Sequence, residues 1–304
     1  MAAGCIGERG VVNRIMPGVC AAAAGKPGAL RFVRAKASDD WPCRGAHPPA
    51  QARLRTYPPQ FARAAKPGGW TPRRGWGNDS GMWQLFQFPL CPFSRKVRLL
   101  LSEKSIGYEL WRENPWEGRD EFFAMNAAGR TPVLRDPERD ITLSDSRAIC
   151  EYFEETSDRN PMINGTAINR AEIRRLVALF DENFFDDVTA PLLHERMKKR
   201  LVMRQSPDSK VLRQAMKLAH EHLYYIDYLI DNRPWLAGST MSLADLAAAA
   251  QISVADYLGG IDWSSHEQSR GWYSVFKSRP SFRPLLSERM EVIQRPSHYA
   301  DVNA

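Results

Sequence analysis

The sequence predicts a small α/β domain followed by an all-helical domain, with a disordered extension in front of both. Three observations predict this fold class. A glycine- and proline-rich stretch gives way to regular hydrophobic patterns at residue 82. Residues 83–156 then alternate between strand-like and helix-like patterns. From residue 166 onward the pattern is helical almost throughout, and 304 residues suffice for two ordinary domains.

The first 81 residues have the composition of a disordered segment. They hold 12 of the 20 glycines and 9 of the 21 prolines, with little hydrophobic periodicity. Such a segment buries too little apolar surface to offset the entropy lost on ordering. Arg14 interrupts its apolar stretch, which argues against a secretory leader. We interpret residues 1–81 as a disordered extension. One explanation is an Arg-rich targeting peptide. The explanation that fits better is that translation begins at Met82 and that residues 1–81 come from an upstream start.

The net positive charge of the chain comes from this extension. Residues 1–81 carry 13 basic and 4 acidic side chains, whereas residues 82–304 carry 29 basic and 31 acidic ones. The formal net charge of +7 for the whole chain is therefore no electrostatic argument for nucleic acid binding by the folded part. No apolar run approaches the ~20 residues that a membrane-spanning helix needs, so no span is expected.

Cysteine and histidine usage predicts a reducing, cytoplasmic environment and no metal site. Only Cys91 and Cys150 lie in the expected folded part, and they lack motif spacing, so no disulfide scaffold is expected. His220 and His222 are two residues apart, which places them on different faces of a helix. We expect neither a zinc nor an iron site.

The small α/β domain is expected over residues 82–157, in the order β-α-β-α-β-β-α. Aromatic and apolar runs bounded by turn residues predict its strands, and Pro137 and Asp140 mark a hairpin turn. Apolar residues at helical spacing predict its helices. The expected strands are residues 83–88, 108–112, 133–134 and 141–143. The expected helices are residues 93–104, residues 120–125 and a third helix that Asp145 and Ser146 open. The apolar face of the first helix consists of Phe93, Val97, Leu100 and Leu101.

The all-helical domain is expected over residues 166–292, with residues 293–304 as a C-terminal tail. Its expected helices are residues 171–201, 210–231, 243–254 and 271–290. Pro191 is expected to bend the first and Pro280 to interrupt the last, since proline removes an interior hydrogen bond. Ser242 and Asp245 have the spacing of a capping box. The helix that follows them is apolar nearly all round, which predicts a central, buried position.

Several segments, taken in this order, resemble the glutathione S-transferase family over residues 82–304. "CPFS" after the first strand, "RTPVL" and "SDSRAICEYFEE" are similar to its N-terminal half, and "SLADL" to its helical half. The resemblance implies a thioredoxin-like N-terminal domain that binds glutathione, an all-α C-terminal domain and a homodimer.

Other segments resemble one subfamily of these proteins. "NPWEGRDEFFAMN", "TAPLLHERMKKRL" and "HYADVNA" are similar to alphaproteobacterial division factors that bind the tubulin-like protein FtsZ and are regarded as lacking transferase activity. The final "DVNA" departs from the more acidic, aromatic-ending tail of that subfamily. This closer resemblance implies FtsZ as a partner and the division site as a location.

Cys91 is the candidate catalytic residue if the protein is an enzyme. It precedes the first turn of a helix, where unpaired N–H groups carry partial positive charge, and Arg95, Lys96 and Arg98 follow it. Both features stabilise a thiolate, the nucleophilic form of the side chain. Ser94 stands where a second cysteine would complete a dithiol pair, so a single-thiol mechanism or stabilisation of a bound glutathione thiolate is favoured. The alternative is a small residue buried for packing.

The resemblance implies that Arg130, Thr131, Pro132, Asp145 and Ser146 bind glutathione. The family has a cis peptide bond before Pro132, which lets the Thr131 backbone pair with the cysteinyl part of glutathione. Ser146 would bind the γ-glutamyl carboxylate at a helix N-terminus, Asp145 the ammonium group, and Arg130 the glycyl carboxylate. Taken without the resemblance, a trans proline, helix capping and an exposed turn arginine explain the same residues.

The sequence leaves three functions open. The favoured one is a scaffold that binds FtsZ filaments, because the closer resemblance includes segments remote from Cys91. The alternative is a glutathione-dependent transferase or thiol-transferase that uses Cys91. A third possibility is a stress-response protein that carries glutathione without turning it over. The fold alone does not choose among them.

Overall fold

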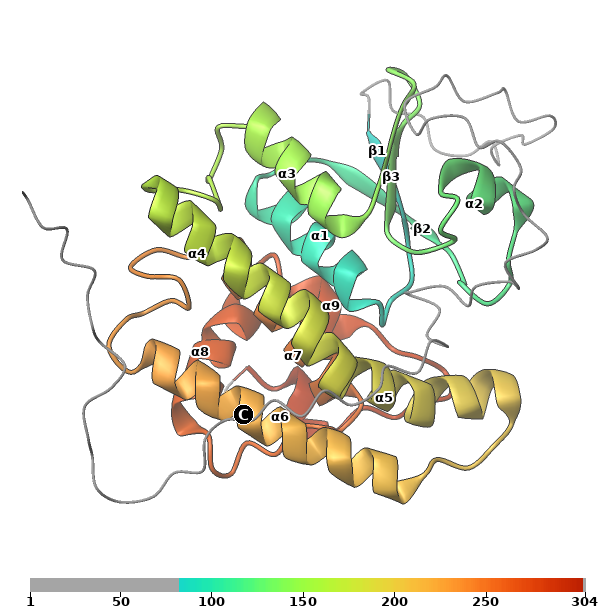
Figure 1. Ribbon diagram of the computed structural model, residues 1–304. Helices are drawn as coiled ribbons and strands as arrows, with labels where there is room; N and C mark the ends of the chain where they lie inside the picture. Colours follow the sequence, from blue (N-terminus) through green and yellow to red (C-terminus); the bar gives the residue numbers. More distant parts are fainter. Residues whose placement is uncertain (1–81, 303–304) are drawn as a thin grey trace, which may run out of the picture. The chain divides into compact units, whose positions relative to one another are not determined.

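The computed structural model describes residues 82–302. A four-stranded sheet with its helices comes first in the chain, and a helical half follows (Figure 1). The disordered extension expected at residues 1–81 lies outside the described residues.

The sheet has the expected hairpin and one parallel pair. Its strands are β1 (Trp83–Gln87), β2 (Tyr108–Arg112), β3 (Val133–Asp136) and β4 (Ile141–Ser144). They lie in the order β2-β1-β3-β4, with β1 parallel to β2 and antiparallel to β3. Parallel neighbours need a crossover connection, and the helix between β1 and β2 supplies it.

Helices cover both faces of this sheet. They are α1 (Pro92–Glu103), α2 (Asp120–Met125) and α3 (Ser146–Thr156). On one face Phe122 of α2 packs with Phe86 and Val133 in a small apolar cluster. On the other face α1 and α3 lie side by side (Figure 1). The order β-α-β-α-β-β-α is confirmed, and the arrangement is the thioredoxin-like one that the resemblance implied.

The second half is helical throughout. Its elements are α4 (Ala167–Ala178), η2 (Leu179–Thr189), α5 (Ala190–Leu193), η3 (His194–Met203), α6 (Ser209–Ile230), α7 (Leu243–Tyr257), α8 (Glu267–Ser278), α9 (Arg283–Ser287) and η4 (Ser297–Ala300). The segments η2 and η3 are π-helical, and η4 is a 3-10 turn. The expected break in the last helix is confirmed, because α8 and α9 flank Pro280.

The first helical run is longer and less regular than expected. It begins at Ala167 rather than near residue 171, because Thr166 and Asn169 form a capping box. It then alternates between α and π geometry until Met203. Pro191, which has no N–H to donate, lies in the short α5 between the two π segments. Figure 1 shows the run changing direction near α5.

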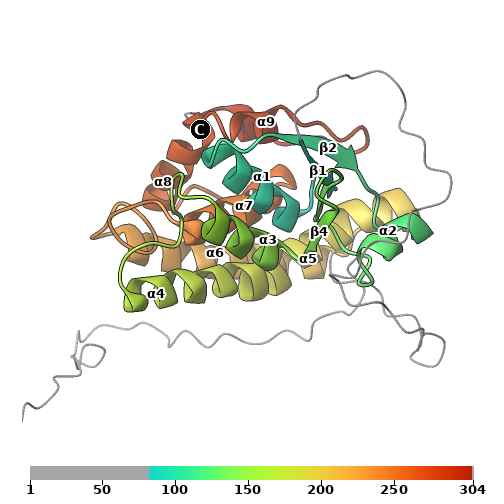
Figure 2. The same ribbon diagram turned by 90° about the horizontal axis from the view of Figure 1, so that it is seen from above.

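Helix α7 is the centre of the packing. The capping box of Ser242 and Asp245 is confirmed, and every residue of α7 is buried. It packs against α1 of the sheet half and against α4 and η2 of the helical half. Figure 2 shows α1 and α7 side by side. One hydrophobic core therefore runs through both halves of the described chain.

The segment expected as a C-terminal tail packs onto the helices. Tyr299 is fully buried. The Nζ of Lys277 donates to the backbone oxygens of His298 at 3.1 Å and Asp301 at 2.8 Å. The His298 ring also contacts the Asp256 carboxylate at 2.8 Å. These contacts anchor the chain as far as residue 301.

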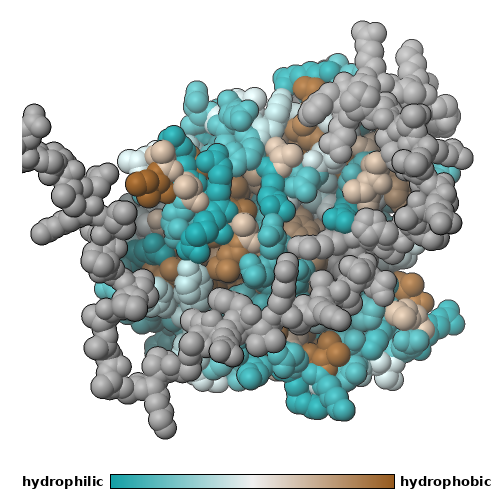
Figure 3. All heavy atoms as spheres, viewed as in Figure 1, coloured by the Kyte–Doolittle hydropathy of each residue, from teal (hydrophilic) through white to brown (hydrophobic). Residues whose placement is uncertain are grey.

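The outer surface is mixed in character. Figure 3 shows small separated hydrophobic areas among hydrophilic side chains on the face viewed in Figure 1. Within residues 82–302, every helix is too short or too polar to cross a lipid bilayer.

Candidate functional site

The residues expected to form the site meet at one edge of the sheet. Cys91 follows β1, Thr131 lies shortly before β3, and Ser146 follows β4. Because β3 pairs with both β1 and β4, the register brings these three chain ends together. The structure thus groups the expected site from segments up to 55 positions apart in the printed sequence.

Cys91 lies at the N-cap position of α1 and has no exposed surface. Its Sγ donates to the backbone oxygen of Thr131 at 3.5 Å. The thiol therefore faces the segment that the resemblance placed against glutathione. In this arrangement, however, the sulfur cannot meet a ligand in solvent without movement of the residues that cover it.

Thr131 and Pro132 form the middle of the site. The peptide bond between them is cis, as the resemblance implied. Thr131 is buried, and its Oγ1 has no hydrogen-bond partner among the residues that the structure describes. The Nδ2 of Asn126 donates to the backbone oxygen of Arg130 at 2.8 Å and so holds the preceding turn. The contact of Arg130 with a glycyl carboxylate stays a prediction.

Asp145 and Ser146 form the third part. Asp145 caps α3, because its Oδ1 accepts a hydrogen bond from the backbone N–H of Arg147 at 2.8 Å. Its φ of +71° lies in the left-handed region, which is strained for a residue with a Cβ. Ser146 is the first residue of α3 and is buried. Capping is confirmed, whereas their contact with glutathione stays a prediction.

The cations that follow Cys91 are paired with carboxylates of the helical half. Lys96 forms a buried ion pair with Asp181. Arg98 contacts Glu288 at 2.5 Å, and Arg95 contacts the same carboxylate at 3.3 Å. Their charge is thus compensated by these carboxylates, which weakens the expectation that they stabilise a Cys91 thiolate.

Arg95 is a hub that sequence reasoning missed. Its guanidinium is fully buried and donates from Nε to the oxygen of Pro89 at 2.8 Å. From Nη1 it donates to Ser253 at 2.8 Å and Tyr299 at 3.0 Å. It therefore links the turn before Cys91 to α7 and to the C-terminal segment. No sequence signal reveals this, since the two hydroxyl partners lie 158 and 204 positions away.

The other cysteine within residues 82–302 is not a second nucleophile. Cys150 is free and fully buried within α3. Burial raises the pKa of its thiol to about 12, so it is protonated at neutral pH. Cys150 is therefore a packing residue.

Histidines of the described chain pair with one another and with carboxylates. Across residues 82–302 no group of three or more His, Cys, Asp or Glu side chains is arranged to hold a metal ion. His222 contacts Asp187 at 3.0 Å, whereas His220 contacts His266 at 2.5 Å. The two histidines of α6 thus have separate partners, as their spacing predicted.

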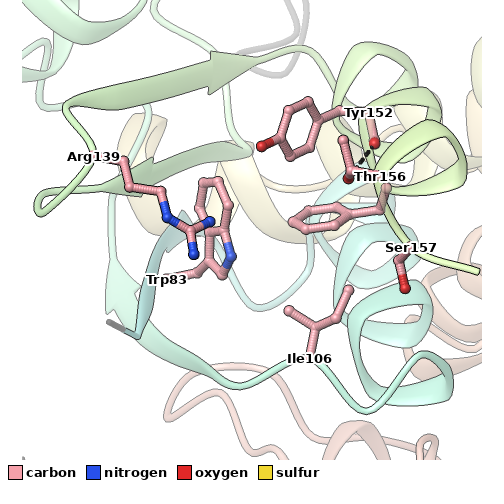
Figure 4. A pocket seen from close by; sticks show the side chains of 7 residues that line it. Trp83, Ile106, Arg139, Tyr152, Thr156 and Ser157 are labelled. Carbon is pink, nitrogen blue, oxygen red and sulfur yellow. Dashed lines mark hydrogen bonds between the residues drawn. The ribbon is translucent and has the colours of Figure 1, made fainter. Parts of the chain in front are cut away.

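A surface depression lies away from the expected site (Figure 4). Its lining residues come from β1, the hairpin, α3 and nearby loops: Trp83, Ile106, Arg139, Tyr152, Phe153, Thr156 and Ser157. It is located at the start of β1, whereas Cys91 follows the end of that strand. None of the expected glutathione-binding residues lines it.

Two similarities decide the family. Residues 90–156 match the model of the glutathione S-transferase N-terminal domain. FtsZ-localized protein A from Caulobacter vibrioides is 42% identical over 221 residues, which cover 72% of this chain and 97% of that protein. The chain belongs to the glutathione S-transferase family.

Solved structures agree with this assignment. FzlA from C. crescentus is 41% identical, with a TM-score of 0.71, and covers 73% of this chain and 100% of its own. A glutathione S-transferase from Rhodospirillum rubrum F11 is 44% identical, with the same TM-score and the same coverage. The glutathione S-transferase resemblance is therefore confirmed for both halves of the fold.

Proposed function

We propose that this glutathione S-transferase-family protein is an FtsZ-associated binding protein that acts at the division site in the cytoplasm. The observation that supports it most is the 42% identity to FtsZ-localized protein A over 97% of that relative. The segments that this chain shares with the FtsZ-binding subfamily include ones remote from Cys91, such as residues 114–126, which a shared binding surface would explain. We include a homodimer in the proposal, and light scattering in solution tests it.

The site geometry supports binding rather than turnover. Cys91 has no exposed surface, and its Sγ is held against the backbone oxygen of Thr131. A nucleophile must come within about 3–3.5 Å of the reacting atom, in an aligned geometry. In the observed arrangement the Cys91 thiol is buried, so it is not positioned to approach a substrate atom.

Co-sedimentation with polymerised FtsZ tests the proposal. We expect the protein to pellet with FtsZ filaments at micromolar concentration, because a filament presents many identical sites. It should stay in the supernatant with unpolymerised FtsZ or with no FtsZ. If the protein fails to pellet with filaments under conditions in which FtsZ itself pellets fully, the proposal is wrong.

A glutathione-dependent enzyme is the second candidate. The observation that favours it is the meeting of Cys91, Thr131 and Ser146 at one edge of the sheet. The role of glutathione, as co-substrate or as a vestigial ligand, belongs to this candidate. Retention on glutathione resin measures binding, and turnover of a model electrophile and of a mixed disulfide measures chemistry.

Replacing Cys91 with serine separates the two candidates. Under the binding proposal, Cys91→Ser leaves filament pelleting unchanged, and turnover is at background before and after the change. Cys150→Ala is the matched control, because it removes another buried thiol, whereas the hydrogen bond to the Thr131 oxygen comes from Cys91. Glutathione-dependent turnover that falls about 100-fold or more in Cys91→Ser but not in the control would establish the enzyme instead.

A further inference from the structure

A cluster of positive charge stands out in the helical half. We define the basic hairpin as residues 194–217, which comprise η3, the loop after it and the first turns of α6. It carries eight basic and two acidic side chains. The other residues from 82 to 302 carry 21 basic and 29 acidic ones. The described part of the chain is therefore acidic except at this hairpin.

The cations of the basic hairpin are largely uncompensated. Five of them are exposed: Arg200, Arg204, Lys210, Arg213 and Lys217. None of these five forms an ion pair with any residue between 82 and 302. Elsewhere on the surface, Arg147 and Arg174 pair with glutamates, whereas exposed arginines such as Arg112 and Arg270 form no ion pair within residues 82–302 but lie on separate elements. The hairpin thus has charge available for another molecule.

Apolar side chains are exposed in the same stretch. Val202 is 44% exposed and Met203 is 42% exposed at the end of η3. Val211 and Met216 are each 37% exposed at the start of α6. Figure 3 shows hydrophobic atoms among hydrophilic ones at the right of the helical half, where Figure 1 places the end of η3. Arginine and methionine are both enriched at the buried centres of protein interfaces.

The loop of the basic hairpin is held in one shape. Glu195 accepts from the backbone N–H of Asp208 at 2.6 Å and from Lys199 at 2.7 Å. Arg204 ends η3 in the left-handed conformation, and Asp208 caps α6 by accepting from the backbone N–H of Lys210 at 2.7 Å. The two acidic side chains of the hairpin are therefore used inside it. A preorganised surface loses less entropy on binding than a mobile one.

We propose that the basic hairpin is a docking surface for an acidic segment of a partner protein. Carboxylates of the segment would pair with the exposed arginines and lysines, and its apolar side chains would cover Val202, Met203 and Val211. Charge complementarity supports this occupant, because within residues 82–302 the hairpin carries net positive charge and the remainder carries net negative charge. The inference goes beyond the proposed association with FtsZ and does not depend on the glutathione site.

The geometry favours a protein segment over a membrane or a nucleic acid. Membrane insertion needs an apolar face buried among lipid headgroups, whereas the loop of residues 204–208 is polar and contains a carboxylate. A nucleic acid presents a long array of phosphates, which the acidic remainder of the surface would repel. A short acidic segment needs only the hairpin itself.

The test measures binding of a fluorescein-labelled glutamate-rich peptide that carries two leucines to the full chain. We expect saturable binding by fluorescence anisotropy at low salt, weakened about tenfold or more between about 50 mM and 300 mM NaCl because screening acts on exposed charges. A combined variant, Arg200→Glu, Lys210→Glu, Arg213→Glu and Lys217→Glu, should bind at least about tenfold more weakly.

Two further variants distinguish the contribution of the hairpin surface from the effect of net charge. Arg112→Glu, Arg159→Glu, Arg270→Glu and Arg283→Glu make the same charge change at exposed positions on other elements, and should leave affinity within about twofold. Val202→Ser with Met203→Ser should weaken binding while keeping its salt dependence. A circular dichroism spectrum shows that each variant is folded.

Three results would overturn the proposal. The first is absence of peptide binding to the unmodified chain at low salt. The second is equal loss in the hairpin and control variants, which would show a response to net charge only. The third is binding to vesicles of anionic phospholipid or to duplex DNA without binding to the peptide. None of these results depends on whether the protein pellets with FtsZ, so the two proposals fail independently.

Discussion

Replacing Arg95 with alanine is expected to lower the free energy of unfolding by about 3–5 kcal/mol, the cost of breaking a buried ion pair by removing one partner. The change would leave Tyr299, Ser253 and the Pro89 oxygen without their buried donor. Glu288 would keep its contact with Arg98 but lose its contact with Arg95. Chemical denaturation followed by circular dichroism measures the effect.

Two variants show whether burial causes this loss. Arg95→Lys retains a charge but not the fork of donors, so it should fall between the original protein and Arg95→Ala. Arg174→Ala removes an exposed arginine paired with Glu151 and should change stability by less than about 1 kcal/mol. If Arg95→Ala lowers the free energy of unfolding by no more than Arg174→Ala does, the buried contacts of Arg95 do not stabilise the fold.

Removing the Asp245 carboxylate is expected to cost at least about 3 kcal/mol, because several buried donors lose their acceptor together. The carboxylate accepts from the backbone N–H groups of Leu236 at 2.8 Å and Ser242 at 2.9 Å. It also accepts from the Ser242 hydroxyl at 2.8 Å and the Trp272 indole at 3.3 Å. Asp245→Ala therefore disturbs the start of α7 and its contacts with α8 and the preceding loop.

The exposed cap of α6 is the matched comparison. Asp208 also caps a helix, but its side chain is in solvent, so Asp208→Ala should lower the free energy of unfolding by much less than Asp245→Ala. Asp245→Asn keeps one acceptor oxygen and should lie between the two. Thermal and urea unfolding give the ranking. Equal losses at the two caps would show that burial of Asp245 adds nothing beyond capping.

Local patterns in the sequence determined most of the fold. Residues 83–156 contain turn and strand signals at short range, and the observed elements agree with the expected ones to within a few residues. The capping box at Ser242 and the apolar body of α7 predicted both the start of that helix and its complete burial. These features were readable because capping and periodicity depend on residues within a few positions of one another.

The residues that form the candidate site could be predicted in part. The resemblance named Cys91, Thr131 and Ser146, and the sheet register brings the three together. The exposure of Cys91 could not be predicted, because its burial depends on tertiary packing around α1, which contacts α3 and α7. Helical periodicity assigned α1 one apolar face, whereas the structure buries it on nearly every side.

What only the tertiary structure decided is the partner of each charge. In the sequence, nothing distinguishes Arg95, Lys96 and Arg98 from Arg200, Lys210 and Arg213, because each is a basic residue within a helical pattern. The first three are buried against carboxylates and hydroxyls from the helical half, and the second three are exposed without an ion-pair partner among residues 82–302. The physical reason is distance along the chain. A charge is compensated by whatever the fold brings within a few ångströms of it, and those groups lie up to 204 positions away.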